Sequence, residues 1–213
     1  MNASVTGQVA PHAYSPPRLR EEQARADFYA LLARLFYAGP DATLLGAVAG
    51  ADALAAEGRN VALAEAWNAL AAASSAMDAE AARLEYDTIF VGTGKAPVTP
   101  YASFYLVETG RERLLAGLRD DLDAMGFARA ADTHEPEDHF AGLCDVMRLV
   151  ITGGGDEDEA LAEQRMFFDR YLRGCYPALC AAVEACDTAD YYRAVARFAR
   201  AFLDVEVESF EML

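Results

Sequence analysis

The segment ARADFYALLARLFYAGP, residues 24–40, decides the fold class of this chain. Its apolar residues recur every three or four positions, which is the spacing of one face of an α-helix. They are Ala24, Phe28, Leu31, Leu32, Leu35 and Phe36. The pattern begins near Arg20 and stops at Gly39-Pro40, a pair of residues that ends helices. The segment therefore predicts an amphipathic helix over residues 20–37.

The same spacing recurs along the rest of the chain. Further helices are expected from about residue 41, over 61–73, 79–91 and 108–125, from Pro136 to 152, over about 160–175, from Pro177, and over about 190–203. Alanine makes up about a fifth of the chain, which favours helix. No segment of useful length alternates apolar and polar residues, as a half-buried β-strand would. We predict an all-α fold, a single-domain bundle of about eight to ten helices.

The two ends of the bundle and one break inside it can be placed from composition. Residues 1–20 contain prolines and no apolar stretch, which predicts a flexible N-terminal arm rather than a signal peptide. The helical domain is then expected over residues 21–213. Residues 126–135 read as a connection between helices and are the expected hinge.

Several helix starts are marked by their residue types. Pro136 suits the first position of a helix, where its missing N–H costs nothing. The acidic run over residues 156–159 is expected to begin another helix, because the helix dipole favours negative charge there. Asp187 or Thr188 is expected to cap the last helix.

Charge excludes some classes of function. The chain has 18 Lys and Arg against 34 Asp and Glu, a formal net charge of −16, which repels the phosphates of nucleic acids.

No apolar run is long enough to span a membrane. A chain without an export signal is expected in the cytoplasm. The four cysteines lack the spacing of a zinc site.

The densest set of titratable groups is HEPEDH, residues 134–139. One interpretation is an ordinary helix start with surface histidines. A second is a metal site, although the order of ligands matches neither a di-iron bundle nor a metal-hydrolase doublet. A third is a peptide-binding site, in which His139 keeps its proton beside the carboxylates and donates it to a backbone carbonyl.

The segment GTGKAPVTPYASFY, residues 92–105, is expected to be irregular, because it holds two glycines and two prolines. It does not fit a nucleotide-binding P-loop, since that pattern requires a glycine where Ile89 stands and Ser or Thr where Ala96 stands. Its aromatic residues either fill the core or form the wall of a groove for apolar side chains.

These motifs carry a resemblance to the TorD/DmsD/NarJ family. EYDTIFVG at residues 85–92 resembles the family's E-Y-x-x-L-F-x-G segment, PYASFY at 100–105 its P-Y-x-S-x-Y segment, and EPEDH at 135–139 its E-P-x-D-H signature. The first predicted helix is also similar. The resemblance spans residues 22–203 and implies an all-helical fold, with halves that some members exchange at a hinge before the E-P-x-D-H segment.

The resemblance also implies a function. Members are cytoplasmic chaperones that bind the twin-arginine signal peptide and the apo form of a molybdopterin-containing oxidoreductase until its cofactor is inserted. They are not enzymes. No metal or cofactor is therefore expected, apart from weak guanine-nucleotide binding. Possible further partners are molybdenum-cofactor insertion proteins, and the expected oligomeric state is a monomer or a domain-swapped dimer.

We expect the client peptide to contact outward-pointing carboxylates in the first turn after Pro136, since arginine forks favour planar carboxylates. The expected peptide-binding residues are Glu135, Asp138, His139, Tyr86, Tyr101, Ser103, Tyr105, Arg25 and Tyr29, of which the last two form a second candidate face. Pro136, Gly92 and Pro100 are expected to be structural. The alternatives are a metal-dependent phosphohydrolase using His134, Asp138 and His139, or a scaffold bundle without a client.

Overall fold

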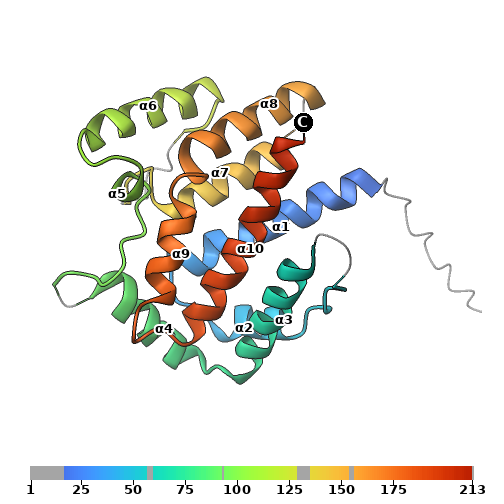
Figure 1. The fold of residues 1–213 in the computed structure, drawn as a ribbon, viewed down its shortest axis with the longest axis vertical. Helices are drawn as coiled ribbons and strands as arrows, with labels where there is room; N and C mark the ends of the chain where they lie inside the picture. Colours follow the sequence, from blue (N-terminus) through green and yellow to red (C-terminus); the bar gives the residue numbers. More distant parts are fainter. Residues whose placement is uncertain (1–16, 57–59, 93, 129–134, 154–155, 213) are drawn as a thin grey trace, which may run out of the picture.

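The computed structural model describes residues 17–56, 60–92, 94–128, 135–153 and 156–212. Over these residues it contains ten α-helices, two π-helical segments and no β-strand, which confirms the all-α prediction (Figure 1). The elements are α1 Pro17–Tyr37, α2 Ala42–Ala49, α3 Val61–Ala76, α4 Ala79–Tyr86, η2 Asp87–Val91, α5 Ser103–Leu106, α6 Arg111–Ala124, α7 Phe140–Thr152, α8 Glu157–Phe167, η3 Phe168–Leu172, α9 Tyr176–Glu184 and α10 Tyr191–Glu211.

Helix α1 begins at Pro17, three residues before the predicted start. Residues 17–20, the last part of the expected arm, are therefore helical. Residues 1–16, the rest of that arm, lie outside the described part. So do residues 129–134, which make up most of the expected hinge. None of the helices in the described part is both long and apolar enough to cross a membrane.

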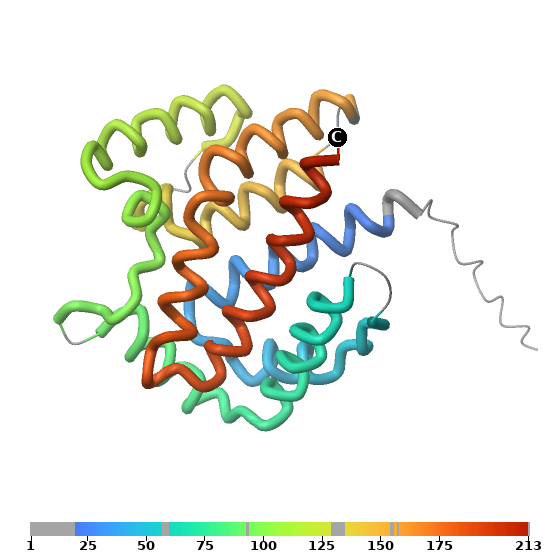
Figure 2. Tube along the Cα trace, viewed as in Figure 1, coloured from blue at the N-terminus to red at the C-terminus, as the bar shows by residue number. Residues whose placement is uncertain are grey.

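The helices pack around α1 and α10. Helix α1 packs mainly against α7, while α10 packs against α3 and α9 (Figure 1). Helix α2 lies along α3, and α8 lies along α7. The tube in Figure 2 shows α10, in red, crossing the molecule next to the orange α9 and reaching the start of α8 with its C-terminal end. The two long helices thus bring the first and last parts of the chain together.

Aromatic rings fill the space between these helices. On the side of α3, Phe28 packs against Trp67, Phe198 and Phe202 with ring centroids 5.1–5.3 Å apart. Towards α7, Phe36 packs against Phe140 at 4.8 Å. Buried rings remove large apolar areas from water, so they supply much of the driving force for folding.

The predicted helix over residues 79–91 is two elements, because α4 continues as the π-helical segment η2. It stops at Gly92, as the sequence predicts. Gly92 has φ 65° and ψ 164°, a region that is essentially restricted to glycine. A Cβ there would lie 3.0 Å from Cα of Ala96. The backbone at this position therefore favours glycine over any residue with a side chain.

Helix α10 is capped from another helix. Both carboxylate oxygens of Glu85 in α4 accept hydrogen bonds from the N–H groups of Asp190, Tyr191 and Tyr192, at 2.8, 3.2 and 2.8 Å. The prediction of Asp187 or Thr188 as the cap is wrong, because a local signal cannot reveal a carboxylate that arrives from a distant segment. The acidic run at residues 156–159 does begin a helix, with Asp156 as the N-cap of α8.

Candidate functional site

The segment PYAS at residues 100–103 and the E-P-x-D-H segment at 135–139 are joined by backbone hydrogen bonds. The N–H of Ala102 donates to the carbonyl of Asp138 at 2.8 Å, and the N–H of Phe140 donates to the carbonyl of Pro100 at 2.8 Å. Tyr101 and His139 form an isolated antiparallel β-bridge. We call this pair of segments the bridged loops. The structural role of Pro100 stays a prediction, because any residue type could supply the carbonyl in this pairing.

Helix α7 begins at Phe140 and not at Pro136, so the predicted helix start is wrong by four residues. Pro136 instead opens a turn, in which its carbonyl accepts from the N–H of His139 at 3.1 Å. The turn replaces the expected first helical turn because residues 138–140 are engaged with the other bridged loop. The local preference of proline for a helix start is overridden by a tertiary contact.

Asp138 points inward. Only 2% of its surface is exposed, and its Oδ2 accepts a hydrogen bond from the buried N–H of Ser103 at 3.0 Å. The prediction that its carboxylate is held outward is therefore wrong. A buried N–H needs an acceptor, and the side chain of Asp138 provides one for Ser103, the first residue of α5.

His139 is also buried, with 5% of its surface exposed, and it is the N-cap of α7. Its Nδ1 accepts from the N–H of Ala141 at 3.2 Å, and its ring packs edge-on against Tyr101 with centroids 5.3 Å apart. Burial lowers the pKa of His139 below 6.5, and the opposing effects of Glu135 and Asp138 are smaller. The expectation that the neighbouring carboxylates keep it protonated is therefore wrong.

The side chains at the edge of the bridged loops form two more links. The hydroxyl of Tyr101 donates to Glu135, and burial together with this bond raises the pKa of the tyrosine. Glu137 accepts two hydrogen bonds from Arg119 of α6, at 3.0 and 2.9 Å. The E-P-x-D-H segment is thus attached to both the preceding loop and α6.

The predicted tyrosine wall is only partly assembled. Tyr101 and Ser103 line a small pocket of about 190 Å³ with Asp138; the other lining residues are Thr99, Phe104, Arg111, Leu115 and Pro136. Tyr86 does not line it: its hydroxyl donates to the carbonyl of Tyr37 at 2.7 Å, and burial raises its pKa to about 12. Tyr105 donates to the carbonyl of Thr99 at 2.8 Å and is also absent from the lining.

The second candidate face, on α1, contains a buried ion pair. Arg25 donates two hydrogen bonds to the carboxylate of Glu206 in α10, with Nε–Oε1 2.7 Å and Nη2–Oε2 2.8 Å. The hydroxyl of Tyr29 donates to the same carboxylate at 2.9 Å, and Glu206 is 1% exposed. Tyr29 is fully buried, so its hydroxyl serves this ion pair and not the surface.

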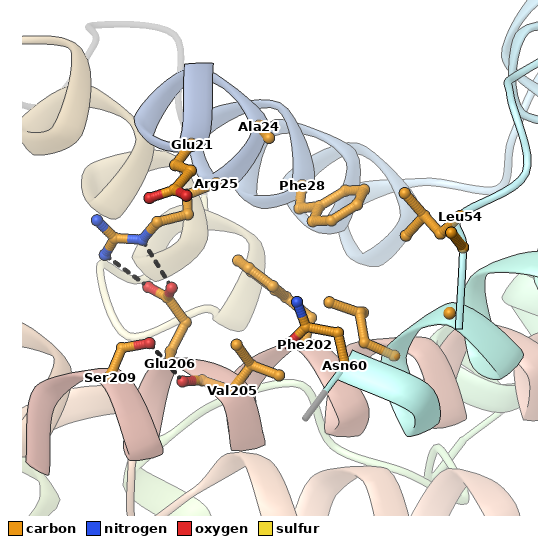
Figure 3. A pocket seen from close by; sticks show the side chains of 13 residues that line it. Glu21, Ala24, Arg25, Phe28, Leu54, Asn60, Phe202, Val205, Glu206 and Ser209 are labelled. Carbon is orange, nitrogen blue, oxygen red and sulfur yellow. Dashed lines mark hydrogen bonds and ion pairs between the residues drawn. The ribbon is translucent and has the colours of Figure 1, made fainter. Parts of the chain in front are cut away.

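This ion pair lies at one end of an apolar pocket between α1, α3 and α10 (Figure 3). The volume of this α1–α10 pocket is about 390 Å³, within the range of small ligand-binding pockets. It is lined by Glu21, Ala24, Arg25, Phe28, Leu54, Ala55, Asn60, Leu63, Ala64, Phe202, Val205, Glu206 and Ser209. In Figure 3, Phe28 and Phe202 lie in its apolar part, where their rings pack edge to face, and Arg25 reaches Glu206 at the opposite end.

Neither the role of Glu206 nor a pocket between these helices was predicted from the sequence. A signal was present, because Glu206 follows Phe202 by four residues on the apolar face of the last helix. A carboxylate on a buried face needs a charged partner. Only the folded chain shows that the partner is Arg25, 181 residues away.

Metal chemistry gains no support from this arrangement. Within the described residues, no three His, Cys, Asp or Glu side chains are grouped as metal ligands would be. In the residue set of the phosphohydrolase alternative, His134 lies outside the described part. Nδ1 of His139 accepts a hydrogen bond from the N–H of Ala141, and the carboxylate of Asp138 accepts one from the N–H of Ser103.

The protein is an all-helical bundle in which the two bridged loops are paired. Comparison with known proteins assigns the chain to a family. The chain matches the family described as nitrate reductase delta subunit over residues 57–181, which is more than half its length. It therefore belongs to that family. The resemblance to the TorD/DmsD/NarJ proteins that the sequence motifs indicated is confirmed.

Two relatives are similar over shorter stretches. The chain is 30% identical over 130 residues to the chaperone protein TorD of Aliivibrio salmonicida, which covers 56% of this chain and 59% of that protein. It is 28% identical over 126 residues to the chaperone protein TorD of Photobacterium profundum, covering 55% and 58%. The match thus spans a little over half of each relative. Both names describe a chaperone, which agrees with the expectation that this protein is not an enzyme.

Proposed function

We propose that the protein is a maturation chaperone for a molybdopterin-containing oxidoreductase. It binds the apo form of this client and the client's twin-arginine signal peptide, and it releases both after the cofactor has been inserted. The observation that carries the proposal is membership in the nitrate reductase delta subunit family, together with two relatives named chaperone protein TorD.

The charge and the surface support binding of such a peptide. A twin-arginine signal peptide joins two guanidinium groups to an apolar stretch. The chain has a net charge of −16 and an apolar pocket with the exposed carboxylate of Glu21 at one end, which complement both parts. In this proposal the protein acts in the cytoplasm, before the client is exported.

Several finer expectations stay predictions. They are direct contact of Glu135, Asp138 and His139 with the client, help from molybdenum-cofactor insertion proteins, weak guanine-nucleotide binding, and exchange of halves in a dimer. Asp138 and His139 are buried and hydrogen-bonded, so their contribution to binding would come from holding the bridged loops in place.

The proposal is tested by calorimetry with the purified full chain. One peptide carries adjacent arginines followed by a natural signal sequence from a molybdopterin oxidoreductase of the same organism, and a second has the two arginines replaced by glutamines. We expect saturable binding of the first peptide and at least tenfold weaker binding of the second. Absence of binding to the first peptide, together with no association with the apo-oxidoreductase in co-purification, would refute the proposal.

A further inference from the structure

We propose that the α1–α10 pocket holds the apolar stretch of the client peptide, and that Glu21 and Asp158 at its open end hold the pair of arginines. This inference rests on the proposed function and assigns it a location. The occupant is a peptide in which adjacent arginines are joined to an apolar segment.

The first argument is the shape and composition of the pocket. Its walls come from α1, α3, α10 and the connection that precedes α3, and they are mostly aliphatic or aromatic, as in sites that accept apolar side chains of a peptide. The ring of Phe28 is fixed by its packing against Trp67 and Phe198, at 5.3 and 5.1 Å. The apolar part of the pocket is thus formed before a ligand arrives, which lowers the entropic cost of binding.

The second argument is the charge at the open end. A neighbouring hollow of about 600 Å³ shares Glu21, Arg25 and Ser209 with the pocket. It adds the side chains of Glu22, Asp158, Leu161 and Phe210. The residues that line this hollow come from α1, α8 and α10. Figure 2 shows the C-terminal end of α10 beside the start of α8. Carboxylates from α1 and α8 therefore surround a surface that is continuous with the apolar pocket.

The third argument concerns Arg25, the one basic side chain among the described residues that line these two hollows. An unpaired arginine would repel an arginine-rich peptide. Arg25 instead makes a two-point ion pair with the buried Glu206, so its charge is neutralised inside the protein. Glu21 and Asp158 are exposed and leave the open end net negative.

The test uses a fluorescent peptide of about 20 residues with adjacent arginines followed by about 12 apolar residues, lengths typical of signal peptides. Ala24 is exposed and lines the pocket, so Ala24→Trp fills the pocket without removing a core contact. The matched control is Ala181→Trp, at an exposed helical alanine of α9 outside the pocket. We expect Ala24→Trp to weaken binding at least tenfold and the control to change it less than twofold.

Charge is tested separately. The double variant Glu21→Gln/Asp158→Asn should weaken binding at least fivefold at low salt and should reduce the dependence of affinity on salt. The control, Glu108→Gln/Asp123→Asn, removes two exposed carboxylates elsewhere and should leave affinity within twofold. Circular dichroism of each variant establishes that it is folded.

The outcomes separate the location from the function. If the wild type binds the peptide and both test variants bind it equally well, the location is wrong and the chaperone proposal stands. If Ala24→Trp changes the oligomeric state but not peptide affinity, the pocket is an interface between copies of the chain, which also overturns this inference. If the wild type binds neither the peptide nor the apo-oxidoreductase, both proposals fail.

Discussion

The role of Asp138 can be decided by replacing its side chain. Its carboxylate is buried and accepts the N–H of Ser103, which is itself 6% exposed. Asp138→Ala leaves that N–H without an acceptor and without access to water. An unsatisfied buried donor costs about 1–3 kcal/mol. The backbone bond from Ala102 to the carbonyl of residue 138 is unaffected by the substitution, so this figure concerns the side chain alone.

The assay is urea unfolding followed by circular dichroism, with a thermal scan as a second readout. For a chain of this length, each kcal/mol shifts Tm by about 2–4 °C, so the expected loss is about 2–12 °C. Asp138→Asn keeps an acceptor oxygen and should lie between the wild type and Asp138→Ala. The control is Asp123→Ala at the exposed end of α6, which should change the free energy of unfolding by less than about 0.5 kcal/mol.

Two results would refute this reasoning. If Asp138→Ala unfolds at the same urea concentration as the control, the carboxylate does not stabilise the bridged loops. If the folded variant keeps its stability but binds the arginine-containing peptide several-fold more weakly, Asp138 contacts the client directly. That second result would restore the peptide-contact role predicted from the sequence.

Three further predictions concern single positions. Glu85→Ala removes the acceptor of the first N–H groups of α10 and should cost about 0.5–2 kcal/mol in urea unfolding, so an unchanged midpoint would contradict the capping role. Gly92→Ala should cost about 1–3 kcal/mol because of its backbone angles, whereas Gly46→Ala in the middle of α2, where a Cβ meets no neighbour, should stabilise the chain by about 0.5–1 kcal/mol. The pKa of His139 is lower in the folded chain than the unfolded value of 6.5, so its contribution to stability is complete above about pH 6.5 and is lost as the pH falls below it. The free energy of unfolding of the wild type should thus fall more steeply between pH 7 and 5.5 than that of His139→Asn, and parallel curves would show that burial does not lower this pKa.

The positions of most helices could be predicted from the sequence because helix formation follows a short-range pattern. The exceptions are α5, which begins inside the segment expected to be irregular, and residues 204–211 of α10, which extend beyond the predicted end. The apolar spacing predicted the end of α1 at Tyr37 and the start of α3 at Val61, and both match the structure. Gly92 was also predicted to end a helix, since a residue with its backbone angles cannot continue one. Such features depend on neighbours within about one helical turn.

The candidate site was predictable only in part. The sequence indicated that the PYAS and EPEDH segments matter, and the structure joins them. The sequence did not indicate that Asp138 and His139 are buried, because nearby prolines and acids suggested an exposed helix start. Exposure is set by what packs against a residue, and here the packing partner lies more than thirty residues earlier in the chain.

By itself, the sequence determined the all-α class, most helix boundaries and the family, because these depend on local periodicity and on short motifs. Only the tertiary structure decided which charged groups face water. It paired Arg25 with Glu206, placed Glu85 at the start of α10, and formed the pocket between α1, α3 and α10. The physical reason is that burial and ion pairing are set by distances in space between residues that lie far apart in the chain.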